Sequence, residues 1–270
     1  MNPISPMSHD ADRQPLHAQS PTQRFSDRAQ DYAQYRPSYP TEAIAHVLAE
    51  LQPTTTLTVA DIGAGTGISS RLLADAGATV WAIEPNVAMR ETAAPHPRVT
   101  FRAGTAEATG LADSSIDLVT CCQAFHWFRQ MEALQEFYRI LKPGGRVALL
   151  WNTRNTEDPF TAAHEVVIRS VADPRVFNRK DRKSAEALAT SPLFTHYRYH
   201  RILWSRAVSQ DALKGLALSS SYVPKEGSVC EQLLAQLDQL FDQWAQPSET
   251  GDRHVLMHYR TDIFLAEAIG

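Results

Sequence analysis

The stretch from Thr58 to Pro85 reads Thr58-Val59-Ala60-Asp61-Ile62-Gly63-Ala64-Gly65-Thr66-Gly67-Ile68, continues through a short helical pattern, and ends in Thr79-Val80-Trp81-Ala82-Ile83-Glu84-Pro85. An apolar run, a glycine-rich corner, a helix and a second apolar run that ends in a carboxylate predict one βαβ unit. Units of this kind bind a nucleoside against the corner between the first strand and the helix. The stretch therefore predicts a nucleoside-binding α/β fold.

The spacing of the glycines helps to distinguish between nucleoside ligands. Gly63 allows a sharp turn off the strand, Gly65 leaves backbone bare beside the ligand, and Gly67 permits close packing where the helix begins. A dinucleotide fingerprint would place its third small residue at position 68, which is Ile68. A dinucleotide is therefore not favoured. No lysine follows the glycines as it does in a P-loop, so a triphosphate is not favoured either.

Glu84 stands at the end of the second strand, where an acidic side chain can accept hydrogen bonds from both hydroxyls of a ribose. The alternative is an ordinary surface glutamate at a strand end. Because the glycine corner precedes it, the ribose role is the preferred interpretation.

Composition limits the classes of protein that the chain can represent. Its 270 residues suit one large or two small domains, and a net charge of −4 gives no electrostatic reason to expect a nucleic-acid partner. No apolar run approaches the roughly 18 residues of a membrane span, and no signal-peptide core is evident. Cys121, Cys122 and Cys230 match neither a disulfide framework nor a zinc pattern, and no metal is expected. We expect a reduced, cytoplasmic protein.

The ends of the chain differ in character. Residues 1–22 are polar and predict a disordered tail, and residues 23–270 predict a single domain with a cofactor-binding half (23–153) and an acceptor-side half with a cap (154–270). Apolar residues from Phe25 recur at helical spacing until Pro37. This helix is either an amphipathic helix packed on the domain or a lid that excludes water. Thr41 is then expected to cap a helix that runs to Leu51.

The remaining pattern predicts a Rossmann-like, doubly wound α/β fold with a mostly parallel seven-stranded sheet, an antiparallel last strand, an N-terminal lid helix and a helical cap. Beyond the first two strands, the expected strands are 99–102, 116–122, 146–151, 195–205 and 255–265. A turn at 142–145 is expected to lead into the strand at 146. The expected helices are 86–94, 130–141, 155–171, 210–219 and 230–246.

Five motifs carry a family resemblance: residues 59–67, 83–85, 104–107, 116–128 and the turn Leu141-Lys142-Pro143-Gly144-Gly145. In order and spacing they resemble the type 11 group of class I S-adenosylmethionine-dependent methyltransferases. The sequences Tyr32-x-x-x-Arg36-Pro37-x-Tyr39-Pro40 and Ala124-Phe125-His126-Trp127-Phe128 resemble the subgroup of the trans-aconitate methyltransferase and its cantharidin-modifying relative. The resemblance covers a little under half of the chain, and it is specific for the cofactor rather than for the acceptor.

The resemblance implies roles for individual residues toward S-adenosylmethionine, whose product would be S-adenosylhomocysteine. The methionine part is faced by Asp61, Gly63, Ala64 and Gly65. The ribose is taken by Glu84, with Pro85 beside it. The adenine lies by Thr105 and Ala106, and Gln123 lies near the sulfonium. Tyr32 and Arg36 complete the expected cofactor set. Many relatives have an aspartate where Thr105 stands, and a threonine hydroxyl accepts the adenine hydrogen bond without charge.

Methyl transfer from a sulfonium is an in-line displacement, so the protein mainly orients the reactants and excludes water. A carboxylate acceptor needs no base, whereas a phenol, amine or carbon acid calls for one, and His126 is then the candidate as base or orienter; the alternative is a hydrogen-bonded wall residue. Arg36 or Arg154 is a candidate for bidentate carboxylate binding, and an ordinary surface arginine is the default interpretation of Arg154. The expected acceptor wall is Tyr35, Trp127, Trp151 and Tyr222.

The preferred function is O- or N-methylation of a small molecule, with a carboxylate as one candidate. The alternatives are a nucleic-acid or protein methyltransferase, a nicotinamide-dependent dehydrogenase, and a non-catalytic cofactor-binding regulator. The dehydrogenase is disfavoured by Ile68, and a nucleic-acid acceptor by the acidic net charge. Neither a membrane nor a nucleic-acid partner is expected, and the sequence does not indicate an oligomeric state.

Overall fold

The computed structural model describes residues 29–51, 54–172, 185–220, 222–249 and 251–270. The expected tail at 1–22 and the start of the expected first helix at 25–28 lie outside the described residues. Among those described, no helix combines the length and apolar character needed to cross a membrane.

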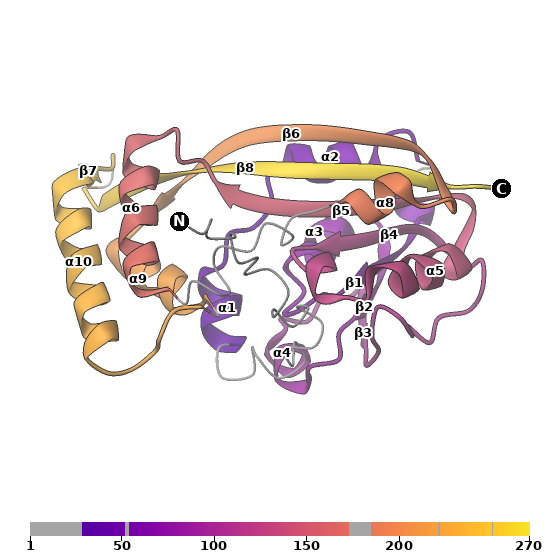
Figure 1. The fold of residues 1–270 in the computed structure, drawn as a ribbon, viewed down its shortest axis with the longest axis horizontal. Helices are drawn as coiled ribbons and strands as arrows, with labels where there is room; N and C mark the ends of the chain where they lie inside the picture. The colour runs from indigo at the N-terminus through magenta and orange to yellow at the C-terminus, as the bar shows by residue number, and fades with distance from the viewer. Residues whose placement is uncertain (1–28, 52–53, 173–184, 221, 250) are drawn as a thin grey trace, which may run out of the picture.

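A twisted sheet forms the centre of the molecule (Figure 1). Its strand order is β3-β2-β1-β4-β5-β8-β6, and a two-residue strand, β7, pairs with β8. The strands are β1 (Thr58–Ile62), β2 (Thr79–Ile83), β3 (Val99–Arg102), β4 (Ile116–Cys122), β5 (Leu141–Arg154), β6 (Phe194–Val208), β7 (Gln246–Pro247) and β8 (Arg253–Ala268). The first five pair in parallel, and β8 runs antiparallel to both β5 and β6. The expected Rossmann-like sheet with an antiparallel last strand is confirmed.

Helices cover both faces of the parallel part because successive strand residues are buried on opposite sides. Val59 packs with α2 (Thr41–Leu48) and α3 (Ile68–Asp75), whereas its neighbour Ala60 packs with α5 (Gln130–Ile140) and α8 (Glu186–Thr190). The helix α4 (Val87–Thr92) follows β2. Asn86 caps α4 by accepting a hydrogen bond from the Met89 N–H.

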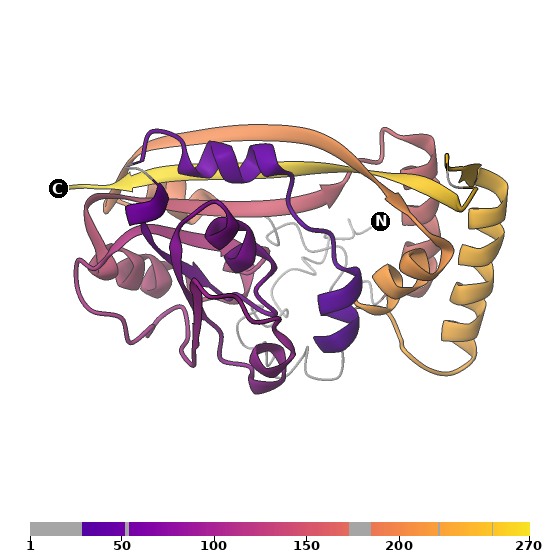
Figure 2. The ribbon, with the colours of Figure 1, turned by 180° about the vertical axis from the view of Figure 1, so that it is seen from behind.

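A third core lies at the far end of the long strands, where α6 (Pro159–Val171), α9 (Gln210–Leu218) and α10 (Ser228–Trp244) form a cap (Figure 1). The helix α1 (Ala29–Tyr35) contacts both α9 of the cap and α4 at the parallel end, and Figure 2 shows it from the other side. The first helix therefore connects the two ends of the molecule. The expected domain halves, divided at residue 153, stay a prediction.

Two local predictions at α2 are wrong. Pro40, rather than Thr41, occupies the N-cap, and it makes no side-chain cap hydrogen bond. Its extended backbone makes Thr41 the first helical residue, so the threonine hydroxyl lies inside the first turn. The helix ends at Leu48 instead of Leu51 because Ala49 is extended and Glu50 takes a positive φ of 65°.

The antiparallel strands are longer than expected. Pairing of β6 with β8 runs from Phe194 opposite Ala268 to Val208 opposite Val255, so each strand stabilises residues whose own pattern is weak. The expected turn at 142–145 is a bulge inside β5, because pairing with β4 jumps from Ile116↔Leu141 to Leu118↔Arg146.

Candidate active site

The glycine corner leaves open space at one position. Gly65 has a φ of +57°, and among the described residues a Cβ built there would have only the Tyr32 ring within 4 Å, at 3.9 Å. At Gly67 a Cβ would lie 2.7 Å from the Phe101 ring, so this glycine permits close packing where α3 begins. The corner therefore combines a tightly packed third glycine with bare backbone at the second.

Asp61 stabilises the glycine corner through hydrogen bonds to neighbouring elements. Its carboxylate is fully buried and accepts hydrogen bonds from the hydroxyls of Ser69 (2.7 Å), Ser70 (2.6 Å) and Thr120 (2.9 Å). Burial raises the pKa of Asp61, and these hydrogen bonds oppose the rise. The carboxylate thus ties β1 to the start of α3 and to β4, and its expected contact with a methionine group stays a prediction.

Glu84 connects the two halves of the βαβ unit. One carboxylate oxygen accepts a hydrogen bond from the Gly65 N–H at 2.9 Å, and the other accepts one from the Asn86 N–H, also at 2.9 Å. Burial raises the pKa of Glu84, opposed by these two backbone hydrogen bonds. Each oxygen retains a lone pair, so the anchored carboxylate can still accept two hydroxyl donors.

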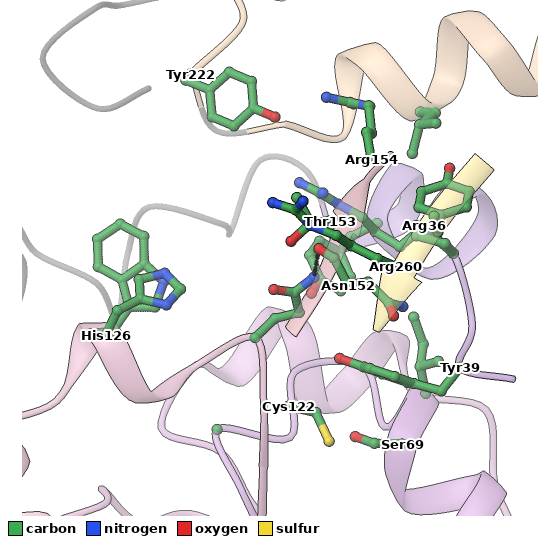
Figure 3. Close-up of a pocket in the computed structure, with 18 of the residues that line it drawn as sticks. Arg36, Tyr39, Ser69, Cys122, His126, Asn152, Thr153, Arg154, Tyr222 and Arg260 are labelled. Carbon is green, nitrogen blue, oxygen red and sulfur yellow. Dashed lines mark hydrogen bonds between the residues drawn. The ribbon is translucent and has the colours of Figure 1, made fainter. Parts of the chain in front are cut away.

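A cavity of about 400 Å³ lies between α1, the glycine corner, the ends of β4 and β5, and the cap (Figure 3). Nine of the candidate residues named from the sequence line it: Tyr32, Arg36, Gly63, Ala64, Gln123, His126, Trp127, Arg154 and Tyr222. Pro37 and Tyr39 of the N-terminal motif line it as well. The structure therefore brings the motif around Tyr32 and the motif around His126 to one site.

Other predicted residues lie outside the cavity lining. Gly65, Glu84, Pro85, Thr105 and Ala106 are not among the lining residues; they lie along the ends of β1, β2 and β3. Thr105 is exposed in a short turn that pairs it with Ala108, and Ala106 is buried in the core. Their expected roles toward ribose and adenine stay predictions.

Two predictions about the acceptor wall are corrected by the structure. Tyr35 packs against α9, since a Cβ on Gly215 would lie 2.2 Å from its ring, so it anchors α1 to the cap. Trp151 is 1% exposed and packs edge-on against Phe264 in the core. Tyr35 and Trp151 therefore pack against other parts of the protein and do not line the cavity.

Trp151 nonetheless determines the state of His126. Its Nε1–H, which can only donate, lies 3.3 Å from His126 Nδ1. An accepting Nδ1 leaves the proton of the neutral imidazole on Nε2. Because a base needs an unprotonated nitrogen to present to the acceptor, this geometry favours His126 as a hydrogen-bond donor or orienting group.

Gln123 and Asn152 form a polar connection at the strand ends. Gln123 has a positive φ of 62° and donates from Nε2 to the Asn152 carbonyl at 2.8 Å. The Asn152 side chain donates to the Ser38 carbonyl and accepts from Thr261, so it links the segment after α1 to β5 and β8. Sequence reasoning missed Asn152, although its place at the end of a parallel strand could have indicated it.

Sequence reasoning also underestimated the arginines of the cavity. Arg154 was expected by default at the surface, but its side chain is 12% exposed, lines the cavity and lies 3.1 Å from Glu165. Arg169 and Arg260, which the sequence did not single out, line the cavity too. They come from α6 and β8, which only the folded structure brings to the end of β5.

Comparison with known proteins gives the family. Residues 60–149 match a family described as a methyltransferase domain. An uncharacterized methyltransferase-like protein of Schizosaccharomyces pombe is 33% identical over 226 residues, which cover 80% of this chain and 85% of that protein. This chain belongs to the methyltransferase family. An uncharacterized methyltransferase of Mycobacterium tuberculosis is 34% identical over 199 residues, which cover 73% of this chain and 76% of that protein.

Solved structures confirm the methyltransferase fold. A protein of Anaeromyxobacter dehalogenans assigned as a type II methyltransferase superposes with a TM-score of 0.60 at 21% identity, over 87% of this chain and 99% of that one. A phosphoethanolamine N-methyltransferase of Haemonchus contortus, solved with phosphomonomethylethanolamine and S-adenosylhomocysteine, gives 0.53 at 17% identity, over 92% and 58%. At these identities the likeness concerns the fold alone.

Proposed function

We propose that this protein transfers a methyl group from S-adenosylmethionine to an oxygen or nitrogen of a small molecule bound in the cavity. The observation that carries the proposal is the bare backbone at Gly65, which faces open space beside Tyr32 and is held by the Glu84 carboxylate. A nucleoside with a charged amino-acid arm fits such a site, because the backbone accommodates the arm and the carboxylate accepts the ribose hydroxyls.

The residues around the corner fit S-adenosylmethionine in type and order. Glu84, with Pro85 beside it, would hold the ribose, and Thr105 and Ala106 would lie by the adenine. The corner at 63–65, Gln123 and Tyr32 would surround the methionine arm, with Arg36 directed to its carboxylate and Asp61 supporting the corner. When bound, this group supplies a methyl already activated by a positive sulfur.

The protein's own contribution is then orientation and exclusion of water. Tyr32 on α1 and Arg36, the residue that follows this helix, line the cavity, and the Arg36 guanidinium lies 5.1 Å from the centre of the Tyr32 ring. His126, with its Nδ1 occupied by Trp151, is suited to donate a hydrogen bond that orients the acceptor. An acceptor that reacts as an anion needs no further base.

The volume of the cavity supports a small acceptor, since about 400 Å³ lies within the usual range of small-molecule sites. The trans-aconitate methyltransferase-like subgroup is supported by its motif, because Tyr32, Arg36, Pro37 and Tyr39 all line the cavity. Membership of that subgroup, the absence of a nucleic-acid or membrane partner, and the cytoplasmic location remain proposals.

Calorimetric titration tests the proposal directly. We expect the purified protein to bind S-adenosylhomocysteine with micromolar or tighter affinity and to show at least a hundredfold weaker affinity for NAD. Formation of S-adenosylhomocysteine from S-adenosylmethionine with a panel of acids, phenols and amines then identifies an acceptor. Preference for NAD would contradict the proposal at its first step.

A second candidate function is that of a protein that binds the same cofactor without transferring its methyl group. The [4+2]-cyclase SpnF shares the fold with a TM-score of 0.51 at 14% identity, over 96% of this chain and 98% of that one, so the fold also serves a protein named for other chemistry. Binding of S-adenosylhomocysteine without product formation across small-molecule, peptide and nucleic-acid panels would favour this candidate or a regulatory binding protein.

A further inference from the structure

Positive side chains gather along the cavity. Four arginines line it (Arg36, Arg154, Arg169 and Arg260), and among the acidic residues only Glu165 does so within the part of the chain that the structure describes. The whole chain carries a net charge of −4, so this excess of positive charge is local. Figure 3 shows Arg36, Arg154 and Arg260 together at one side of the site and His126 at the other.

Glu165 cannot neutralise the group because two arginines share it. Its Oε2 lies 3.1 Å from Arg154 Nη1, and its Oε1 lies 3.6 Å from Arg169 Nη2. Burial lowers the pKa of Arg154, but the nearby Tyr222 and Glu165 outweigh that effect and hold the pKa above its ordinary value. Arg154 is therefore a permanent cation in a largely enclosed position.

Arg260 has an unused donor. Its Nε is buried and has no hydrogen-bond partner among the described residues. Oδ2 of Asp262 lies 3.9 Å from this Nε, which is too far for a hydrogen bond. The other oxygen of Asp262 accepts hydrogen bonds from Tyr199 and Arg201. A buried donor that lacks a partner costs about 1–3 kcal/mol, so an arriving oxygen would be favoured there.

Strand pairing brings these two arginines to the same end of the sheet. Arg154 is the last residue of β5 and lies opposite Tyr259, the residue before Arg260 on β8. Both side chains line the cavity, and guanidinium groups offer paired N–H donors that match carboxylate or phosphate oxygens.

We propose that Arg154 and Arg260 form a binding subsite for an anionic group on the acceptor, so that the acceptor class is carboxylates or phosphate esters. The inference rests on the proposed function, in which Arg36 serves the carboxylate of S-adenosylmethionine. That compound carries a sulfonium and an ammonium against one carboxylate, so its arrival adds positive charge. A cationic acceptor would be repelled, and an anionic one attracted, in this partly enclosed site.

Three probes of equal chain length separate the effect of charge from that of shape: glutarate, glutaramide and 1,5-diaminopentane. Glycerol 3-phosphate provides the phosphate arm, and each probe is titrated by calorimetry into protein saturated with S-adenosylhomocysteine. We expect one of the two anions to bind at least about tenfold more tightly than glutaramide, and diaminopentane to bind least. Whichever anion binds more tightly identifies the source of the negative group.

Variants assign the effect to the arginines. Arg260→Gln should weaken anion binding about tenfold, and Arg154→Lys, which keeps the charge beside Glu165 but loses the planar fork, should weaken it less. Arg253→Gln is the matched control, because Arg253 lies on the same strand, pairs with Asp242 at the surface and does not line the cavity. Its anion affinity should stay within twofold of the parent protein.

The outcomes are separable from those of the proposed function. Affinity for S-adenosylhomocysteine is measured first on every sample, and the probes are titrated again without it. If the parent protein does not bind S-adenosylhomocysteine, the proposed function is contradicted. The titrations of the probes without S-adenosylhomocysteine still test the arginine subsite in that case. The subsite is overturned if glutaramide or diaminopentane matches both anions, if Arg260→Gln binds anions as the parent does, or if neither anion binds at millimolar concentration.

Discussion

The glycine corner and the arginine-lined end of the cavity are organised in different ways. At the corner both carboxylates have partners within the protein: Glu84 accepts from two backbone N–H groups, and Asp61 accepts from three hydroxyls. At the other end the buried Nε of Arg260 has no partner within the part of the chain that the structure describes, and Arg154 shares Glu165 with Arg169. The corner is therefore pre-formed, whereas the arginine end is completed by what it binds.

The comparison predicts its largest effect at Gly65. Gly65→Val should weaken S-adenosylhomocysteine binding by at least about a hundredfold, because the side chain fills the space that the bare backbone leaves open. Gly144→Val is the matched control, since Gly144 also has a positive φ (73°), a Cβ built there would have no described residue within 4 Å, and it lies in the bulge of β5. Both variants carry the strain of a side chain at positive φ, about 1–2 kcal/mol.

Calorimetry with S-adenosylhomocysteine and thermal unfolding separate the two effects. Both variants should lose stability to a similar degree, and only Gly65→Val should lose affinity. Equal affinity in the two variants would show that the open space at Gly65 is not where the ligand lies.

Glu84 predicts the next largest effect and a dependence on pH. Glu84→Gln should weaken S-adenosylhomocysteine binding about tenfold, because the amide presents one acceptor oxygen in place of two. Burial raises the pKa of Glu84. As the pH is lowered, the affinity of the parent protein for S-adenosylhomocysteine should therefore begin to fall at a higher pH than it would with an exposed glutamate. In Glu84→Gln this part of the pH dependence should be absent.

Unfolding does not explain such a loss. A carboxyl whose folded-state pKa lies above its unfolded-state pKa binds the proton more tightly when folded, so its effect on stability is most favourable at low pH and diminishes as the pH rises through the raised pKa. Calorimetric titrations and unfolding curves across the same pH series test this. An affinity that falls in parallel in both proteins would assign the titration to another group.

The same contrast explains how much the sequence could predict. The sheet, the corner and Glu84 follow from local patterns, because the glycines, the flanking apolar runs and the carboxylate lie close together in the chain and interact across one βαβ unit. Trp151 and Tyr35 were misplaced because composition does not distinguish an aromatic side chain in a core from one in a wall. The packing of Tyr35 on Gly215 and of Trp151 on Phe264 depends on elements far away in the chain.

The arginine end could be predicted least. Arg154 and Arg260 are separated by most of the cap, and only the antiparallel pairing of β5 with β8 makes them neighbours. An isolated arginine at a strand end is most often a surface residue. Nothing in the sequence therefore indicated that Arg154 is buried beside Glu165.

His126 lies between the two regions and predicts the smallest effects. His126→Gln should lower kcat about tenfold, less than the 10²–10⁴-fold typical of a lost base, because its Nδ1 is occupied and its Nε2 carries the proton. Trp151→Phe keeps the buried ring but removes the donor to His126, and kcat should fall about threefold as the imidazole loses its fixed tautomer. Rates of S-adenosylhomocysteine formation with an acceptor from the panel measure both variants.

Trp81→Phe is the control, because Trp81 packs against the same core from β2 and is not a lining residue of the cavity, and the kcat of this variant should match that of the parent protein. The pH profile separates orientation from proton transfer. If His126 only donates, His126→Gln lowers the rate evenly across the pH range while the parent profile keeps its shape. A parent rate that rises through a pKa near neutrality and a variant rate that does not would instead make His126 the base. The cavity would then contain a proton-transfer group between its pre-formed corner and its arginine end.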